Sequence, residues 1–449
     1  MGSVSSKKQL IDKLPKIAHS ASDLEILFEA GTYRQRLHDA ISKAKFRIYL
    51  VALYLQDDEA GRSILDALYA AKKRNPALDI KVFVDWHRAQ RGLIGEKKSE
   101  GNSALYQKYA RENQHNIDIL GVPVRNKEIF GVLHLKGFVI DDTVIYSGAS
   151  INNVYLAQND TYRFDRYHIL QNKHLADSMV NYISQNLLAS DAVNPLSVAK
   201  RPTVKMIKPA IRDLRAKLQQ AQYQFLASSI NDNQVGLTPI VGLGKRKNML
   251  NKHICDLIAS AETKLTICTP YFNPPRGIML EIKRALKRGV QISIIVGDKT
   301  ANDFFIDPSE PFKTISTVPY LYEMNLYAFA RRYEAFIAKR QLKLHIWKHE
   351  KNSFHLKGVW VDGTHALLTG SNLNPRAWKL DLENAILVHD KKGLLQEKFN
   401  QELDNIFAHT ELIGSYKLIE NLEAYPPAVY KLLKRIKRLK ADHLLNQIL

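Results

Sequence analysis

Apolar runs divide the first half of the chain into a strand–helix–strand unit. Residues 46–55 (FRIYLVALYL) form a nearly continuous apolar run, which is typical of a strand buried on both faces. Residues 61–74 place their apolar side chains on one helical face, as residues 34–45 also do, and residues 79–85 (DIKVFVD) form the next strand. A helix between two such strands predicts parallel strands joined by a right-handed crossover.

The same order of elements returns about 220 residues later. Residues 44–55 align without a gap on residues 261–272, and a helix at 277–288 and a strand at 290–296 follow. A repeat of this length indicates a duplicated domain and not a solenoid. We therefore predict an α/β fold built from two pseudo-symmetric halves.

The remaining segments predict the domain boundaries. We expect a polar, partly helical arm at 1–30, a first half at 31–194, a connecting segment at 195–235, a second half at 236–425 and a basic amphipathic helix at 426–449. The connecting segment begins with prolines and continues as a charged helix at 210–225. Residues 312–340 predict an aromatic-rich helical insertion, which serves either ordinary helix packing or a lipid-facing surface.

Composition narrows the class of protein. The 449 residues carry a net charge of +20, which implies an anionic partner: nucleic acid, an acidic membrane or a phosphate-rich substrate. The two cysteines, Cys255 and Cys268, exclude a disulfide scaffold or a cysteine-rich zinc site. The first ten residues lack the apolar core of a secretory signal, and Gly2 fits the myristoylation pattern only loosely. No stretch approaches the ~20 apolar residues that span a bilayer, so we expect a soluble or peripheral protein.

Residues 426–449 interleave basic and apolar positions as an amphipathic helix does. Each lysine or arginine near an anionic bilayer contributes about 1 kcal/mol to binding, so the pattern favours a helix lying on such a surface. A packed terminal helix with a solvated basic face is the alternative. The basic residues are Lys431, Lys434, Arg435, Lys437, Arg438 and Lys440.

The candidate chemistry lies in two copies of an H-x-K-x4-D motif. The six residues are His134, Lys136, Asp141, His355, Lys357 and Asp362. Residues two apart in a strand face the same way, so the histidine and lysine of each copy are expected to project together. Two imidazoles and two ammonium groups suit phosphoryl transfer: one imidazole attacks phosphorus, the other protonates the leaving oxygen, and the lysines neutralise the phosphoryl oxygens. A lysine beside each histidine disfavours a cation, so we predict no metal and no cofactor.

Other polar residues have less specific patterns. Asp141 and Asp362 end their strands, where they could hold a histidine tautomer or a lysine, or else serve as turn and cap residues. Several cationic residues are candidates for substrate phosphates, some of them at the carboxyl ends of strands, where ligands collect in α/β sheets; each could equally be a solvated or salt-bridged surface residue. They are Arg88, Arg91, Arg163, Arg166 and Lys299.

The doubled motif resembles the phospholipase D superfamily. The resemblance implies two mixed sheets flanked by helices, one shared active site and a covalent phosphohistidine. The small-residue and asparagine patch of that superfamily resembles 369–372, which ends at Asn372, with Asn374 just beyond; Glu383 matches the acid that orients a catalytic histidine. The first half departs from the pattern, because Ser150 stands where Asn372 would lie. There, Asn152 and Asp165 are the candidate substitutes for the asparagine and the acid.

Longer stretches, among them VDWHRAQRG, VGDKTANDF and TGSNLNPRAWKLDLENAIL, are similar to phospholipase-D-type bacterial phosphatidylserine synthases over roughly residues 45–390. This resemblance implies transfer of a phosphatidyl group from CDP-diacylglycerol to L-serine with release of CMP. It also implies a cytosolic enzyme that associates peripherally with anionic lipid. His134 is then the expected nucleophile and His355 the acid and base, and the reverse assignment stays open.

Three other interpretations remain at this point. The first is a cardiolipin synthase or a hydrolytic phospholipase D, which the motifs do not distinguish from the favoured activity. The second is a phosphodiesterase or nuclease, against which stand the amphipathic tail and the lack of a recognisable nucleic-acid-binding module. The third is a non-catalytic lipid-binding protein, against which stand the two intact motifs. We predict no dedicated nucleic-acid partner, and the sequence leaves the oligomeric state open.

Overall fold

The computed structural model describes residues 4–92 and 101–439 and divides into two compact units. One unit, here the first-motif unit, comprises Pro15–Leu250 and Lys379–Leu387. The other, here the second-motif unit, comprises the chain up to Leu14, Asn251–Trp378 and the chain from Val388. The short segment Lys379–Leu387 thus belongs with the first motif although it follows the second motif in sequence.

The first-motif unit contains a mixed eight-stranded sheet in the order β10-β5-β4-β3-β6-β7-β9-β2. Its strands are β2 (Leu24–Leu27), β3 (Arg47–Val51), β4 (Asp79–Asp85), β5 (Asp118–Val122), β6 (Phe138–Ile140), β7 (Thr143–Ser147), β9 (Tyr167–Gln171) and β10 (Asn194–Pro195). The strands β3 and β4 are parallel, as predicted; β5 is parallel to β4, and the other neighbours are antiparallel. The unit also holds β1 (Ile17–Ser20), β8 (Arg163–Phe164) and β11 (Gln234–Leu243).

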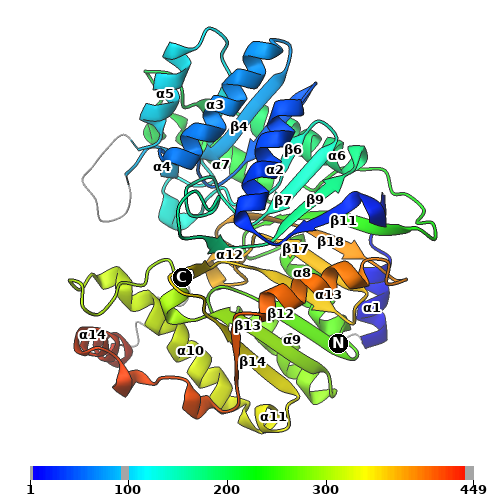
Figure 1. Cartoon of the computed structure of the whole chain (residues 1–449), viewed down its shortest axis with the longest axis vertical. Coiled ribbons are helices and arrows are strands. Elements are labelled where there is room, and N and C mark those ends of the chain that lie inside the picture. Colours follow the sequence, from blue (N-terminus) through cyan, green and yellow to red (C-terminus); the bar gives the residue numbers. More distant parts are fainter. Residues whose placement is uncertain (1–3, 93–100, 440–449) are drawn as a thin grey trace. The chain divides into compact units, whose positions relative to one another are not determined.

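Six helices accompany these strands among the described residues of this unit. They are α2 (Ala30–Lys43), α3 (Glu59–Arg74), α4 (Trp86–Ala89), α5 (Ser103–Glu112), α6 (Lys173–Ile183) and α7 (Val204–Leu218). The helices α2 and α3 pack together (Figure 1). The apolar face of α3 is buried through Ile64, Leu65 and Leu68, so the predicted amphipathic helix is confirmed.

The second-motif unit repeats the same architecture. Its strands run in the order β17-β16-β12-β13-β14-β19, which matches β7-β6-β3-β4-β5 of the first-motif unit in its first five positions. They are β12 (Lys264–Cys268), β13 (Gln291–Gly297), β14 (Leu342–Trp347), β16 (Gly358–Val361), β17 (His365–Thr369) and β19 (Thr410–Ile413), preceded by the short β15 (Ser353–Phe354). The strands β12, β13 and β14 are parallel. The predicted duplication of mixed sheets is therefore confirmed.

The helices assigned to this unit include the predicted insertion and tail. They are α1 (Val4–Asp12), α8 (Met249–Ser260), α9 (Arg276–Lys287), α10 (Val318–Arg332), α11 (Glu334–Ala338), α12 (Pro375–Lys379), α13 (Gln396–Phe407) and α14 (Pro427–Arg438). The ends of α8 and α12 cross the division between the units, and so does the strand β18 (Leu382–His389).

Two predicted boundaries are wrong. The predicted arm at 1–30 is not a separate segment over its described residues 4–30, because β1 pairs with β11 and β2 pairs with β9 through backbone hydrogen bonds. The connecting segment likewise does not end at 235, since β11 extends to Leu243 within the first-motif unit. A short strand with few apolar residues has no periodicity strong enough to reveal its pairing partner.

The charged helix begins earlier than predicted. Instead of 210–225, α7 covers Val204–Leu218 with Pro209 inside it. The Thr203 side chain accepts a hydrogen bond from the Met206 backbone and caps the helix. Its apolar residues Ile207, Ile211, Leu214 and Leu218 are buried at helical spacing. Tertiary packing of this apolar face outweighs the cost of the proline.

The aromatic insertion and the basic tail pack against each other. Tyr320 and Leu321 of α10 form a buried cluster with Val429 and Leu433 of α14 and with Tyr425. In this cluster the aromatic side chains serve helix packing and not a lipid-facing surface. The apolar face of α14 is packed against α10 of the same unit. No helix among the described residues is long and apolar enough to cross a membrane.

Candidate active site

The first motif is an extended segment and not the predicted strand. Only Leu133 forms a β-bridge, which is parallel and joins it to Leu382 at the start of β18. The N–H of His134 donates to the carbonyl of Leu382 (3.0 Å), and the N–H of Leu382 donates to the carbonyl of Val132 (3.0 Å). These bonds set the segment beside the beginning of β18, where Glu383 and its neighbours lie.

Glu383 is the carboxylate partner of His134. The Nδ1 atom of His134 lies 2.9 Å from Oε2 of Glu383, and both side chains are buried. With Nδ1–H donated to the carboxylate, Nε2 is the ring nitrogen that carries the lone pair. In the sequence, Asp165 was the only candidate for the acid beside the histidine of the first half. In the structure, Glu383 from β18 lies beside His134 instead. Asp165 is buried, and its carboxylate accepts the N–H of Arg166 (2.9 Å).

Asn384 holds the backbone of Lys136. Its Oδ1 accepts the N–H of Lys136 (2.8 Å), and its Nδ2 donates to the carbonyl of the same residue (2.8 Å). Nδ2 also donates to the hydroxyl of Tyr223 (3.0 Å). The side-chain amide thus replaces the neighbouring strand that an extended segment would otherwise pair with. The role of Asn384 was not predictable from the sequence, since a lone asparagine after Glu383 carries no signal for it.

Two buried aspartates hold the residues before His134. Asp85, at the end of β4, accepts the N–H groups of His87 and Arg88 on Oδ1 (2.9 Å each) and that of Leu133 on Oδ2 (3.0 Å). Burial raises the pKa of Asp85 to about 6, although these backbone hydrogen bonds oppose the shift. Asp381 accepts the N–H of Val132 (3.0 Å). Sequence analysis missed both roles; for Asp85 the available signal was a carboxylate at a strand-to-helix junction.

The second motif brings its histidine and lysine into contact. The Nζ atom of Lys357 contacts both ring nitrogens of His355, with 3.1 Å to Nε2, and both side chains are buried. The two side chains therefore project together, as predicted. The ring of Tyr271 meets His355 edge-on, with the ring centroids 6.1 Å apart, and stacks on Tyr322 at 5.2 Å. An aromatic wall from α10 and the end of β12 thus borders the imidazole.

Asp141 and Asp362 make the contacts of the turn and cap alternative. The carboxylate of Asp141 accepts the backbone N–H groups of 45–47 at 2.8–3.1 Å, and that of Asp362 accepts those of 262–264 at 2.8–2.9 Å. Both residues have positive φ, +50° and +53° respectively. Burial would raise the pKa of Asp362, but hydrogen bonds from the backbone N–H groups outweigh it and hold the pKa below its usual range. Asp141 thus ties the turn after β6 to the start of β3, and Asp362 ties the turn after β16 to the start of β12.

The small-residue patches correspond residue by residue. Ser147 and Thr369 each accept the N–H two residues ahead, and Asn152 and Asn374 each accept the N–H three residues ahead. Asn152 therefore corresponds to Asn374 and not to Asn372, for which it was the predicted substitute. The Oδ1 atom of Asn372 is buried and has no hydrogen-bond partner among the described residues. Ser150, in the place of Asn372, is also buried.

The predicted phosphate-binding cations differ in their surroundings. Arg91 forms a bidentate ion pair with Glu128, and Lys299 pairs with Glu323 (2.9 Å) and Glu420 (3.0 Å), so both take the salt-bridged alternative. Arg88 lies over the ring of Tyr54 (5.0 Å).

Two more cations come from the region of β8. Arg163 lies over the ring of Tyr155 (4.6 Å), and the buried Arg166 approaches Nε2 of His168 at 3.4 Å. Within residues 4–92 and 101–439, no group of three or more histidine, cysteine, aspartate or glutamate side chains is arranged to hold a metal ion.

The basic side chains of α14 form an exposed face. Lys431, Lys434, Arg435, Lys437 and Arg438 are exposed, whereas Lys440 and Gly2 lie outside the described residues. The helix is amphipathic as predicted, and its packed apolar side leaves the cationic side in solvent.

Known proteins resemble this chain along its whole length. Residues 37–186 and 254–410 match the family model for the cardiolipin synthase PLD-like domain. The CDP-diacylglycerol–serine O-phosphatidyltransferase of Escherichia coli is 47% identical over 443 residues, and that of Haemophilus influenzae is 47% identical over 447; each alignment covers 98% of both chains. A CDP-diacylglycerol–glycerol-3-phosphate 3-phosphatidyltransferase of Schizosaccharomyces pombe is 24% identical over 96% of this chain and 98% of its own.

The fold agrees with these sequence matches. The crystal structure of phosphatidylserine synthase from Haemophilus influenzae superposes with a TM-score of 0.97, at 45% identity and with both chains fully covered. The matched regions contain both motifs together with Glu383, Asn384 and Asp85. The chain therefore belongs to the phospholipase D-like family, in the branch of the CDP-diacylglycerol–serine O-phosphatidyltransferases.

Proposed function

We propose that this protein transfers the phosphatidyl group of CDP-diacylglycerol to L-serine, forming phosphatidylserine and CMP. The observation that carries the proposal is the buried His134–Glu383 pair, within a chain 47% identical to two enzymes named for this reaction. An imidazole whose Nδ1–H is held by a carboxylate has a fixed tautomer and a more nucleophilic Nε2.

The reaction proceeds in two displacements. Nε2 of His134 attacks the phosphorus that bears the diacylglycerol, the bond from phosphorus to the bridging oxygen breaks, and CMP leaves after His355 donates a proton to it. His355 then accepts the proton of the serine hydroxyl, whose oxygen attacks the phosphatidyl-histidine and releases His134. Lys136 and Lys357 neutralise the phosphoryl oxygens as negative charge grows on them.

The surroundings of His134 support its role as the nucleophile. Three successive N–H groups, those of Val132, Leu133 and His134, are bound by Asp381, Asp85 and the carbonyl of Leu382. A nucleophile attached to a backbone held in this way keeps its position through both displacements. The reverse assignment, with His355 attacking, makes the opposite prediction for the covalent adduct.

Measurements of CMP release test the proposed reaction. CDP-diacylglycerol presented in mixed micelles is expected to release CMP in a serine-dependent manner, with phosphatidylserine as the product. Glycerol 3-phosphate, phosphatidylglycerol and water alone serve as competing acceptors. Release of CMP that ignores serine but follows one of these acceptors would replace the proposed reaction with a related phosphatidyl transfer or with hydrolysis.

Acid-quenched adducts test the roles of the histidines. We expect His134→Ala to abolish the phosphatidyl-histidine and His355→Ala to leave it trapped or slowly formed. The exposed His115 provides a matched control, and His115→Ala is expected to behave as the wild type. An adduct that survives in His134→Ala but disappears in His355→Ala would reverse the assignment.

We also propose that the enzyme works at an anionic membrane surface through the exposed basic face of α14. Val429 and Leu433 are packed inside the unit, so the contact is electrostatic and does not require insertion of the apolar face. We propose a peripheral enzyme at the cytoplasmic face of the membrane in which CDP-diacylglycerol is embedded, and the exposed cationic face of α14 supports this proposal.

A further inference from the structure

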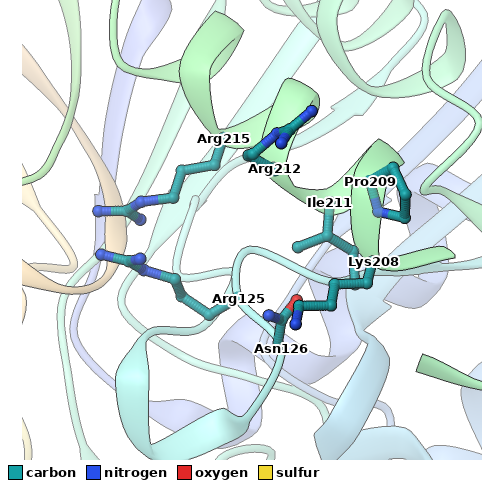
Figure 2. A pocket seen from close by; sticks show the side chains of 7 residues that line it. All are labelled: Arg125, Asn126, Lys208, Pro209, Ile211, Arg212 and Arg215. Atoms are coloured by element: carbon teal, nitrogen blue, oxygen red, sulfur yellow. The ribbon is translucent and has the colours of Figure 1, made fainter. Parts of the chain in front are cut away.

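A cationic cavity of about 380 Å³ lies in the first-motif unit, between α7 and the loop after β5 (Figure 2). Four of its lining residues are basic, and none of the described residues that line it is acidic. The basic residues are Arg125, Lys208, Arg212 and Arg215. Arg212 is paired with Asp213 (3.4 Å), which lies outside the lining, so the positive charge of the cavity rests mainly on Arg125, Lys208 and Arg215.

Both walls of the cavity have defined positions. Lys208, Arg212 and Arg215 follow one another at i, i+4 and i+7 on α7 and so share one face of the helix. On the opposite wall the carbonyl of Arg125 accepts a hydrogen bond from Nε2 of His87 (2.6 Å). The Cγ of Arg125 lies 3.4 Å from the position a Cβ on Gly131 would take, so its stem packs on that glycine.

One nitrogen in each of two guanidinium groups that line this cavity has no hydrogen-bond partner among the described residues. Figure 2 shows the guanidinium of Arg215 extending from α7 and that of Arg125 from the loop, lying close to each other. Nε of Arg125 and Nη1 of Arg215 are buried and have no hydrogen-bond partner among the described residues. Burial lowers the pKa of both, and the charge of Arg125 helps to lower the pKa of Arg215 to about 10. Two facing cations with unused donors are unfavourable unless an anion joins them.

We propose that this cavity binds a phosphate-bearing anion between Arg125 and Arg215. The planar guanidinium fork matches two oxygens of a phosphate, and two forks from opposite walls can share one phosphoryl group. Exposed Lys208 and Arg212 add positive charge at the rim. A soluble phosphate compound and a phospholipid headgroup both carry this chemistry. The proposal concerns binding alone and holds whichever acceptor the enzyme uses.

Calorimetric titration of the full chain with inorganic pyrophosphate tests the site. We expect Arg125→Gln and Arg215→Gln each to weaken binding by at least tenfold, because each removes charge-assisted hydrogen bonds to the phosphate. The matched control is Lys205→Gln, which removes an exposed charge from the same helix outside the cavity lining. The control is expected to change the affinity by less than twofold. An equal loss of pyrophosphate affinity in all three variants would mean that binding depends only on the net charge of the protein, and would overturn the proposal.

Thermal unfolding without added anion separates binding from a structural role. Removing Arg215 relieves repulsion between two cations, so Arg215→Gln is expected to melt at the wild-type temperature or higher and to gain less from pyrophosphate. A melting temperature several degrees below the wild type without anion would mean that Arg215 supports the fold, and would overturn the proposal.

Vesicle co-sedimentation at fixed net lipid charge identifies the source of the phosphate. If phosphatidylglycerol vesicles, but not pyrophosphate, bind in a manner that needs Arg125 and Arg215 and not Lys205, the occupant is a lipid headgroup. If pyrophosphate binds in that manner, the occupant is a soluble phosphate compound. Binding of neither probe that depends on the two arginines would overturn the proposal.

Discussion

Asp362 offers a direct test of the difference between a turn residue and a catalytic one. Its carboxylate accepts hydrogen bonds from the backbone of Glu262, Thr263 and Lys264 and from the Thr263 hydroxyl (2.8–2.9 Å). We predict that Asp362→Ala, Asp362→Asn and Asp362→Gly lower the free energy of unfolding and leave kcat of the folded enzyme nearly unchanged.

The magnitude follows from the bonds and from the backbone conformation. A buried charge-assisted hydrogen bond contributes about 1.5–3 kcal/mol, but Asp362 is half-buried, so we take about 1 kcal/mol for each of three backbone bonds. Alanine at its φ of +53° adds about 1 kcal/mol of backbone strain. Asp362→Ala is therefore expected to cost about 4 kcal/mol. Asp362→Gly avoids the strain, and Asp362→Asn loses mainly the Oδ2 bond, at about 1–2 kcal/mol.

Melting curves and kinetics on the same samples provide the assay. A loss of 4 kcal/mol in a unit of 150–250 residues lowers the melting temperature by about 8–16 °C. The pKa of folded Asp362 lies below its ordinary value, so its carboxylate stabilises the fold above the unfolded pKa. That stabilisation is lost as the pH falls through the folded pKa. The gap between the wild type and Asp362→Ala is therefore expected to narrow below a pH of about 4.

Kinetics well below the melting temperature decide between the two roles. Asp141, with the same backbone contacts in the other half, is an internal control, and Asp141→Asn is expected to behave like Asp362→Asn. If Asp362→Asn melted like the wild type yet lost kcat by a hundredfold or more, the structural assignment of the carboxylate would be wrong.

Four further predictions concern the site and the tail. Glu383→Gln is expected to lower kcat by roughly 10²–10⁴-fold with little change in KM, because the amide no longer balances a charged His134; steady-state kinetics giving a normal kcat would contradict this. Asn384→Leu leaves the N–H and carbonyl of buried Lys136 unpaired, so urea unfolding should show a loss of about 2–4 kcal/mol, and an unchanged midpoint would exclude the backbone role. Asp85→Asn turns an amide N–H₂ toward the N–H of Leu133 and is expected to destabilise the fold near pH 5. Since the folded pKa of Asp85 is raised to about 6, the wild type loses stability relative to this variant by about 2 kcal/mol from pH 4 to pH 7, and a constant difference would refute the buried, raised pKa. Replacing the five exposed basic residues of α14 by glutamine is expected to abolish salt-sensitive binding to anionic vesicles without lowering the melting temperature; salt-insensitive binding that persists would reject the electrostatic tail.

The sequence predicts the elements that have strong local signals. Residues 79–85 coincide with β4, and the buried strands, amphipathic helices and duplicated order follow from apolar periodicity. The helix around Pro209 was misplaced because a proline indicates a break only when no apolar face holds the helix together. The strands β1 and β2 were not predicted because their partners, β11 and β9, lie at least 140 residues further along the chain.

The site was predictable to the level of its motifs but not of their supports. His134, Lys136, His355 and Lys357 stand out because the pattern repeats, and the resemblance supplied Glu383 as an orienting acid. Which of the two histidines Glu383 contacts could not be inferred from the sequence, because the contact depends on the β-bridge between Leu133 and Leu382, which are far apart in the chain. The spacing of Asp141 and Asp362 made them look catalytic. The structure shows instead that both residues have positive φ and accept hydrogen bonds from the backbone, so their fixed distance from the histidine reflects the position of the turn.

The two duplicated halves share the side-chain contacts that hold their turns and caps, but they differ in the side chains that contact their histidine rings. Asp141 and Asp362 fasten equivalent turns, and Asn152 and Asn374 make equivalent caps. Around the histidines, by contrast, Glu383 meets the ring of His134, whereas Lys357 and Tyr271 meet that of His355. An imidazole held by a carboxylate is suited to attack phosphorus, and one beside an ammonium group is suited to exchange a proton with a leaving or entering oxygen. The two halves thus share one scaffold, and in the proposed mechanism the contacts of each imidazole distinguish the nucleophile from the acid and base.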